Sequence, residues 1–130
     1  MANGRAKSPS YPWYPRDYEF DEEVKLMSYE QEGIYRRLLD HQWFHAGIPM
    51  DPKQIALLVP KVSPRRFLVL WHGIASKFHE ADGRLVNPKL ERVRAEWDTY
   101  RSTKSHAGQK GAASRWHKHD KPNSKPMAVP

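Results

Sequence analysis

The sequence predicts a mainly α-helical domain with a single β-hairpin, followed by a basic tail. Three observations support this fold class. A helix-capping residue stands directly before proline at three places, Asp51-Pro52, Ser63-Pro64 and Asn87-Pro88. An Asp82-Gly83 pair, the strongest short signal for a hairpin turn, separates two segments of strand character. Residues 84–130 hold 11 Lys and Arg against 4 Asp and Glu, whereas the two kinds are equal in number before residue 84.

A chain of 130 residues has room for one domain with a modest core. We expect residues 1–10 to be disordered, residues 11–100 to form the domain, and residues 101–130 to form a flexible basic tail. The sequence contains no cysteine, which excludes disulfides, thiolate catalysis and cysteine-ligated zinc. One of its longest apolar runs, Phe67 to Trp71, is far shorter than the roughly 20 residues that span a bilayer. We therefore expect a cytoplasmic protein that makes no use of a membrane.

The first long helix is predicted to begin after Ser28, because Gln31 stands three residues later and completes a capping box. Gly47 is the expected cap at its C-terminal end. Apolar residues recur at intervals of three and four and predict its buried face: Ile34, Tyr35, Leu38, Leu39 and Trp43.

Two further helices are predicted from Pro52 to about Val59 and from Pro64 to about Phe78, and the hairpin follows directly. The predicted core draws on all of these elements and consists of Ile34, Leu38, Leu39, Trp43, Ile55, Leu58, Phe67, Trp71, Ile74, Phe78 and Leu85.

A last helix is predicted to begin after Asn87, with apolar residues at heptad-like spacing: Leu90, Val93, Trp97 and Tyr100. Two arrangements stay open for it, packing back onto the domain or pairing with a second copy in a homodimer. The stretch "YPWYPRDYEF" before the first helix is rich in proline and aromatic residues. We interpret it as an extended arm whose aromatic side chains pack across the domain, namely Trp13, Tyr14, Tyr18 and Phe20.

Three helices followed by a hairpin are the order of a winged helix-turn-helix, in which the third helix enters the major groove of DNA and the hairpin touches the adjacent backbone. Lys and Arg bind phosphates, and Arg also reads guanine edges. The candidate DNA-binding residues on the third helix are Arg65, Arg66, His72 and Lys77, and Arg84 lies beside the hairpin turn. An ordinary solvated helix face is the alternative interpretation of these charges.

The segment "KSHAGQKGAASRW" opens the predicted tail and combines cations with small residues and one large aromatic side chain. Cations on an adaptable backbone bind phosphates without regard to base sequence. Trp116 offers a flat surface on which an unpaired base can stack, and docking on the domain or on a partner protein is its alternative role. The candidate contacts to DNA in the tail are Lys104, Lys110, Arg115, Trp116 and Lys118.

We expect no metal site and no cofactor. His41 and His45 stand four residues apart, but zinc requires three or four ligands, and Gln42 occupies the position where the metalloprotease motif has glutamate. The acidic cluster from Asp21 to Glu23 is interpreted as charge that stabilises the start of a short helix. No Ser/His/Asp set can be assembled from the spacing, so we expect no catalytic residues and no enzyme.

Several stretches resemble the YdaU-like family, a domain of unknown function found in phage and prophage replication regions. The most specific are "MSYEQEGIYRRLL", "DGRLVNPKLE" and the closing "GQKGAASRW", and the resemblance covers about residues 11–116. It implies a winged-helix protein of the replisome-organiser or initiator type, with a replicative helicase or its loader as the candidate protein partner. Many relatives continue well beyond this segment, whereas this sequence ends at Pro130. A short accessory protein and a partner-binding surface on the domain itself are both open.

DNA binding in the initiation of phage replication is therefore the predicted function. Two alternatives are a protein–protein interaction module that recruits a replication factor, and a transcriptional regulator. The net charge of +7, which lies entirely in the C-terminal part of the chain, favours a polyanionic partner such as nucleic acid.

Overall fold

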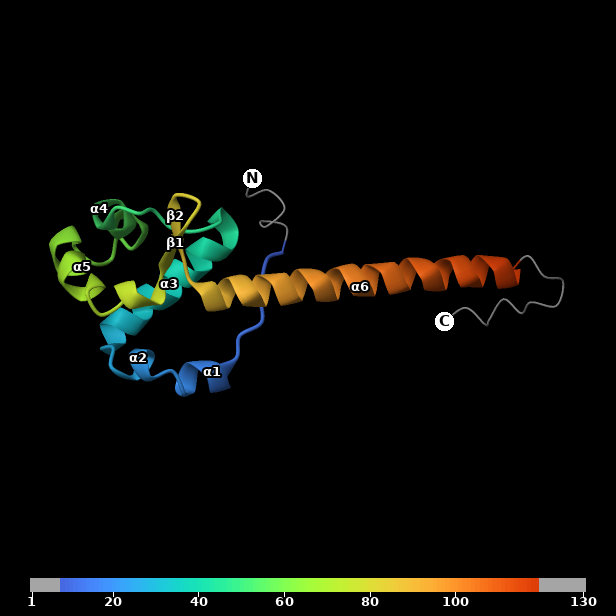
Figure 1. The fold of residues 1–130 in the computed structure, drawn as a ribbon, viewed down its shortest axis with the longest axis horizontal. Helices are drawn as coiled ribbons and strands as arrows, with labels where there is room; N and C mark the ends of the chain where they lie inside the picture. The colour runs from blue at the N-terminus through green and yellow to red at the C-terminus, as the bar shows by residue number, and fades with distance from the viewer. Residues whose placement is uncertain (1–7, 120–130) are drawn as a thin grey trace. The chain divides into compact units, whose positions relative to one another are not determined.

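The structure is a computed structural model that describes residues 8–119, with the backbone alone described at Gln109 and over residues 112–119. It is mainly helical and contains one two-stranded antiparallel sheet, which confirms the predicted fold class at this level. Figure 1 shows the elements, which in chain order are α1 (Pro15–Glu19), α2 (Glu22–Lys25), α3 (Tyr29–His45), α4 (Pro52–Ile55), the 3₁₀ turn η2 (Ala56–Leu58), α5 (Pro64–Trp71), the 3₁₀ turn η3 (Ala75–Lys77), β1 (His79–Ala81), β2 (Arg84–Val86) and α6 (Pro88–His119).

The chain divides into two compact units between Arg94 and Ala95, so that α6 belongs in part to each. The first unit contains every other element. Within it, α4, η2 and α5 contact one another and η2 contacts α3, which places the pair α4 and α5 side by side at one end of the unit (Figure 1).

The start of α3 follows the prediction. The backbone amide of Gln31 donates to the Ser28 hydroxyl at 3.1 Å, and the Ser28 amide donates to the side-chain oxygen of Gln31 at 2.8 Å. The predicted C-terminal cap is wrong by one residue, because the left-handed residue is Ala46, with φ of 63°. Gly47 instead allows the hairpin to approach closely, because a Cβ atom at this position would lie 3.0 Å from the Leu85 carbonyl oxygen.

The hairpin forms at the predicted turn. Asp82 and Gly83 both have positive φ angles, of 54° and 79°, as a two-residue hairpin turn of type I′ requires. A third segment joins the sheet, because Ile48 exchanges two backbone hydrogen bonds with Leu85, of 2.8 and 2.9 Å. The segment that follows α3 is thereby fixed beside β2.

Helix α5 is shorter than predicted, since it ends at Trp71 and not near Phe78. A residue of α3 contacts this end of the helix. The side-chain amide of Gln31 donates to the Leu70 carbonyl oxygen at 3.0 Å, which satisfies one of the carbonyls at the helix end. A Cβ atom at Gly73 would lie 2.4 Å from the same amide nitrogen, so Gly73 leaves the space in which Gln31 sits.

The N-terminal arm departs from the prediction in two ways. It is not extended throughout, because Pro15 begins the short helix α1 at a position where proline loses no hydrogen bond. Phe20 does not pack across the domain, and its side chain is 75% exposed. Trp13 and Tyr18 do pack together, with ring centroids 5.0 Å apart, and the Arg36 guanidinium lies 3.9 Å from the centroid of Trp13.

Helix α6 continues to His119, so residues 101–119 of the predicted tail are helical. No proline occurs between Pro88 and residue 122, and the intervening sequence is rich in Ala, Lys and Arg, which have high helix propensity. Gly108 and Gly111 lower that propensity without preventing the helix. Residues 1–7 and 120–130 lie outside the described residues, and with them most of the segment for which disorder is predicted.

The core lies in the first unit and contains most of the residues predicted for it. Leu58 and Leu85 are half-buried, and the other nine are buried. The core also contains residues that are not predicted: Ile48, which is fully buried beside the hairpin, and Val24 and Met27 around α2. Trp43 is 1% exposed, and its indole nitrogen donates to the Ser8 carbonyl oxygen at 3.1 Å.

We expect Trp71→Ala to lower the free energy of unfolding by about 3 to 5 kcal/mol, because removing a buried indole leaves a cavity. Trp71 stacks against Phe67 at 5.7 Å and lies 5.9 Å from Phe78, so the loss affects both rings. Urea titration followed by circular dichroism measures the change. Leu57→Ala is the control, since Leu57 is 72% exposed and its truncation should change stability little. Equal stabilities for the two variants would contradict the core assignment.

Candidate nucleic-acid interface

The outward face of α5 is the best candidate for binding a polyanion. Ser63 caps the helix by accepting a hydrogen bond from the Arg66 amide at 3.2 Å. Phe67 and Trp71 are buried, so the opposite side of the helix faces away from the core. Three exposed residues at intervals of four and three share that side: Arg65, Val69 and His72.

The sequence around α5 is basic. Residues 52–79 contain five Lys and Arg and no Asp or Glu. Three of these cations, Lys53, Lys61 and Arg65, are exposed and have no side-chain partner within the described part of the chain. They are free to contact an external anion.

Arg66 is also exposed, but it is already paired. Its Nε and Nη2 atoms donate to the Glu30 carboxylate at 2.9 and 2.6 Å in a bidentate arrangement. The hydrogen bonds from Arg66 lower the pKa of Glu30. A phosphate would therefore have to compete with a carboxylate for this guanidinium.

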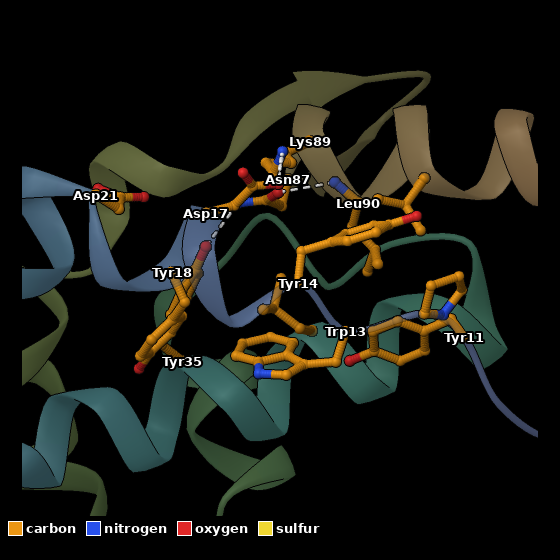
Figure 2. Close-up of a pocket in the computed structure, with 13 residues that line it drawn as sticks. Tyr11, Trp13, Tyr14, Asp17, Tyr18, Asp21, Tyr35, Asn87, Lys89 and Leu90 are labelled. Atoms are coloured by element: carbon orange, nitrogen blue, oxygen red, sulfur yellow. Dashed lines mark hydrogen bonds and ion pairs between the residues drawn. The ribbon is translucent and has the colours of Figure 1, made fainter.

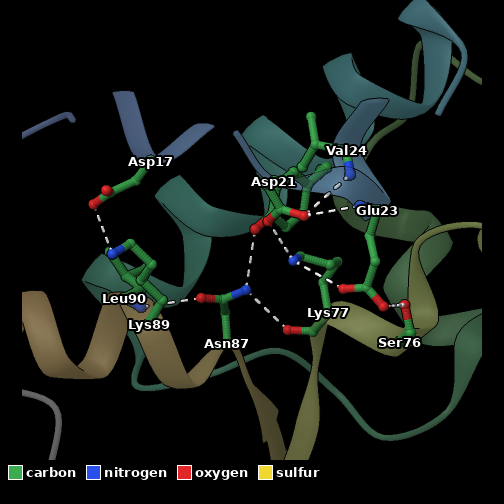
Figure 3. A network of polar contacts seen from close by, with 10 residues as sticks. Asp17, Asp21, Glu23, Val24, Ser76, Lys77, Asn87, Lys89 and Leu90 are labelled. Carbon is green, nitrogen blue, oxygen red and sulfur yellow. Dashed lines mark hydrogen bonds and ion pairs between the residues drawn. The ribbon is translucent and has the colours of Figure 1, made fainter. Parts of the chain in front are cut away.

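Lys77 is held inside the first unit. Its side chain is 13% exposed, and its ammonium group lies 2.5 Å from Asp21 and 3.0 Å from Glu23. Figure 3 shows this cluster, in which Ser76 also donates to Glu23 at 3.1 Å. Lys77 thus fixes α2 against η3, and its ammonium group is not presented as a contact for phosphate.

Burial of Asp21 acts to raise its pKa. The hydrogen bonds that its carboxylate accepts from Lys77 and from the backbone amides of Val24 and Glu23 have the opposite effect and outweigh burial. The pKa of Asp21 is therefore lowered. Asp21 is also the N-terminal cap of α2. The acidic cluster therefore has the structural role that the sequence predicts, together with a lysine partner that local spacing does not reveal.

The hairpin is poorly suited to phosphate contact. Arg84 turns back toward the domain, where its Nη2 atom donates to the Gly47 carbonyl oxygen at 3.0 Å. Its Nε atom is buried and has no hydrogen-bond partner among the residues that the structure describes. The exposed side chains near the turn include two carboxylates, Glu80 and Asp82.

The second unit presents another basic surface along α6. No Asp or Glu occurs between residues 99 and 119. Arg101, Lys104 and Lys110 are exposed, and the Lys104 ammonium lies 5.9 Å from the ring centroid of Tyr100. Tyr100 stacks on Trp97 with centroids 5.5 Å apart. Three predicted contacts have helical backbones, and their side chains lie outside the described residues: Arg115, Trp116 and Lys118.

The two histidines of α3 stack on each other, with ring centroids 4.2 Å apart. Partial burial lowers the pKa of His41, and the nearby His45 and Arg84 lower it further. Over the described residues, no group of three or more His, Cys, Asp or Glu side chains comes together in a way that could hold a metal ion.

An aromatic pocket lies between the N-terminal arm, α3 and the start of α6. Figure 2 shows the rings of Trp13, Tyr14 and Tyr18 around it. The pocket holds only about 60 Å³, far less than the roughly 300 Å³ of a small ligand site. An ion pair between Asp17 and Lys89, 2.7 Å long, lies at its edge. The aromatic side chains attach the arm to the domain and leave too little room for a ligand.

The chain matches no protein-family profile, no curated protein and no solved structure. The resemblance to the YdaU-like family therefore stays a prediction from the sequence. No helix in the described residues combines the length and the apolar character needed to cross a bilayer.

We expect Lys77→Met to reduce the acid sensitivity of the fold. A lowered pKa of Asp21 in the folded state stabilises the fold above its ordinary pKa of about 4, and this contribution is lost as the pH falls through the folded-state value. Removing the ammonium group removes most of that contribution. The stability difference between wild type and Lys77→Met should therefore shrink as the pH falls below about 4. Urea titrations between neutral and acidic pH measure this difference, and a constant difference would contradict the assignment.

Proposed function

We propose that the protein binds DNA through a winged helix-turn-helix whose third helix is α5. The order of the elements supports this: α3, then α4 with η2, then α5, then the hairpin. The pairing of Ile48 with Leu85 supports it further, because a winged helix also adds a short strand between its first two helices to the edge of the hairpin.

The observation that carries the proposal is the stripe of Arg65 and Val69 on α5 with His72 directly after the helix, which is exposed and free of carboxylates. Arginine offers two parallel donors to guanine, and an apolar side chain fits the methyl group of thymine. Val69, which is 68% exposed, is suited to that second contact. Lys53 and Lys61 supply unpaired cations on the elements just before α5 and suit phosphate contacts.

The basic part of α6 is a second DNA-binding surface, and it is less selective for base sequence. Exposed cations without neighbouring carboxylates attract the phosphate backbone whatever its sequence, and that attraction weakens with salt. We propose the role that the family resemblance implies, in the initiation of phage or prophage replication within the cytoplasm of a bacterial host. The hairpin does not enter this binding mode as a phosphate contact, because Glu80 and Asp82 lie at its turn.

We expect Arg65→Gln to weaken binding to a preferred duplex by about 1 to 3 kcal/mol and to relax the base preference at one position, as the loss of an arginine–guanine contact does. Selection from a random duplex library, followed by anisotropy titration, measures both effects. Arg92→Gln is the matched control, because Arg92 is also exposed and lies outside α5. If the two variants lose affinity equally, α5 does not read base edges.

We expect the triple variant Arg101→Gln, Lys104→Gln, Lys110→Gln to flatten the dependence of log affinity on log salt. Each phosphate contact contributes about 0.9 to that slope on duplex DNA, so the three together should remove roughly 2.7. Thermal unfolding should be nearly unchanged, since all three side chains are exposed. Titrations at several salt concentrations provide the slope, and an unchanged slope would show that α6 does not contact the backbone.

A further inference from the structure

A groove lies between α3 and the turn that joins η2 to α5. One wall consists of residues at intervals of three and four along one face of α3: Glu30, Gly33, Ile34 and Arg37. The other wall is the chain from Leu58 to Val62. The groove has a volume of about 420 Å³, which falls within the range of sites that take up a ligand or the side chains of a peptide.

The floor of the groove is apolar and its rim is positive. Ile34 and Val59 are buried at the floor, and Leu58 and Val62 are half-buried. Arg37 and Lys61 are exposed and have no side-chain partner within the described residues. Among the residues that the structure describes, one carboxylate lines the groove, that of Glu30, which Arg66 already binds. An occupant with apolar side chains and flanking carboxylates would match both features.

The glycine at position 33 is an independent observation that also indicates a binding groove. Glycine inside a helix is unfavourable relative to alanine, because it costs backbone entropy on folding. The fold does not require it here, since a Cβ atom at this position would meet nothing within 4 Å. Gly73 differs in this respect, because a Cβ atom there would lie 2.4 Å from the side-chain amide nitrogen of Gln31. What Gly33 does provide is an unobstructed wall to the groove, where a partner backbone can approach α3 closely.

We propose that this groove binds an amphipathic acidic helix of a partner protein. The apolar side of such a helix would lie on Ile34, Leu58 and Val59, and its carboxylates would pair with Arg37 and Lys61. Helices bind grooves of this kind through apolar residues at intervals of three and four. The groove makes no use of the outward face of α5, and Lys61 is the residue that it shares with the proposed DNA interface.

The test uses the full-length protein and a displayed library of helical peptides of about 15 residues, or four turns. Leucine occupies the positions of one face in every peptide, and the flanking positions vary among Glu, Lys and Ser. We expect peptides with flanking Glu to be enriched. Their affinity should fall at least 10-fold in Arg37→Glu, with Arg92→Glu as the control for net charge. No enrichment of Glu, or equal losses in the two variants, would overturn the proposal.

Gly33→Leu separates groove binding from folding. Leucine has a higher helix propensity than glycine and meets open space, so we expect the melting temperature to stay the same or to rise by a few degrees. Peptide affinity should nevertheless fall at least 10-fold, because the new side chain occupies the groove. Gly108→Leu is the matched control, since a Cβ atom at Gly108 also meets nothing within 4 Å. Peptide binding that survives in Gly33→Leu would overturn the proposal.

A DNA titration of Gly33→Leu distinguishes the groove from the proposed DNA interface. We expect the duplex affinity of Gly33→Leu to stay within 2-fold of wild type while its peptide binding is lost. If duplex affinity falls as far as in Arg65→Gln, the groove belongs to the DNA interface and the docking proposal is wrong. If Arg65→Gln has no effect on DNA while Gly33→Leu abolishes peptide binding, the docking proposal stands and the DNA-binding proposal fails.

Discussion

A buried amide pair, Gln42 on α3 and Asn87 at the start of α6, holds the first unit in one arrangement. Gln42 is fully buried, its side-chain oxygen accepts from the Asn87 amide at 2.7 Å, and its nitrogen donates to the Asn87 carbonyl oxygen at 3.1 Å. The Asn87 side chain caps α6 through the Leu90 amide and donates to the Lys77 carbonyl oxygen and the Tyr35 hydroxyl (Figure 3). Buried polar groups that lose their partners cost about 1 to 3 kcal/mol each, so a shifted register is disfavoured.

The position of the hairpin follows from this pair. Strand β2 ends at Val86, directly before Asn87, so Gln42 determines where the hairpin returns to α3. Arg94 strengthens the same junction, because its Nη2 atom donates to the carbonyl oxygens of Gln42 and Trp43 at 3.2 and 3.0 Å. These are carbonyls near the end of α3, where a cation is favourable. These hydrogen bonds therefore connect the hairpin, the beginning of α6 and the end of α3.

Helix starts could be predicted because each depends on residues within one turn: Ser28 with Gln31, Ser63 with Pro64, Asn87 with Pro88. Other features depend on contacts between distant residues. Helix α5 ends where Gln31 reaches the Leu70 carbonyl, 39 positions along the chain, and Lys77 pairs with Asp21, 56 positions away. Spacing along α5 and η3 makes Lys77 look like a free cation. The sequence likewise does not indicate that Gln42 lies in the core, because polar residues at helix edges are usually solvated.

The contacts that each cation already makes determine whether it can bind a polyanion. Lys77 is half-buried against carboxylates, Arg94 is buried against main-chain carbonyls, and Arg66 is paired with Glu30, so these three act in the fold. The carboxylates at the hairpin turn repel a polyanion, while the unpaired cations near α5 attract one. In the proposed binding mode, this asymmetry would direct a duplex toward α5 and away from the hairpin turn, without a phosphate contact from the hairpin. It would also leave Arg37 available to an acidic partner at the groove, whose carboxylates would compete with phosphate for Lys61.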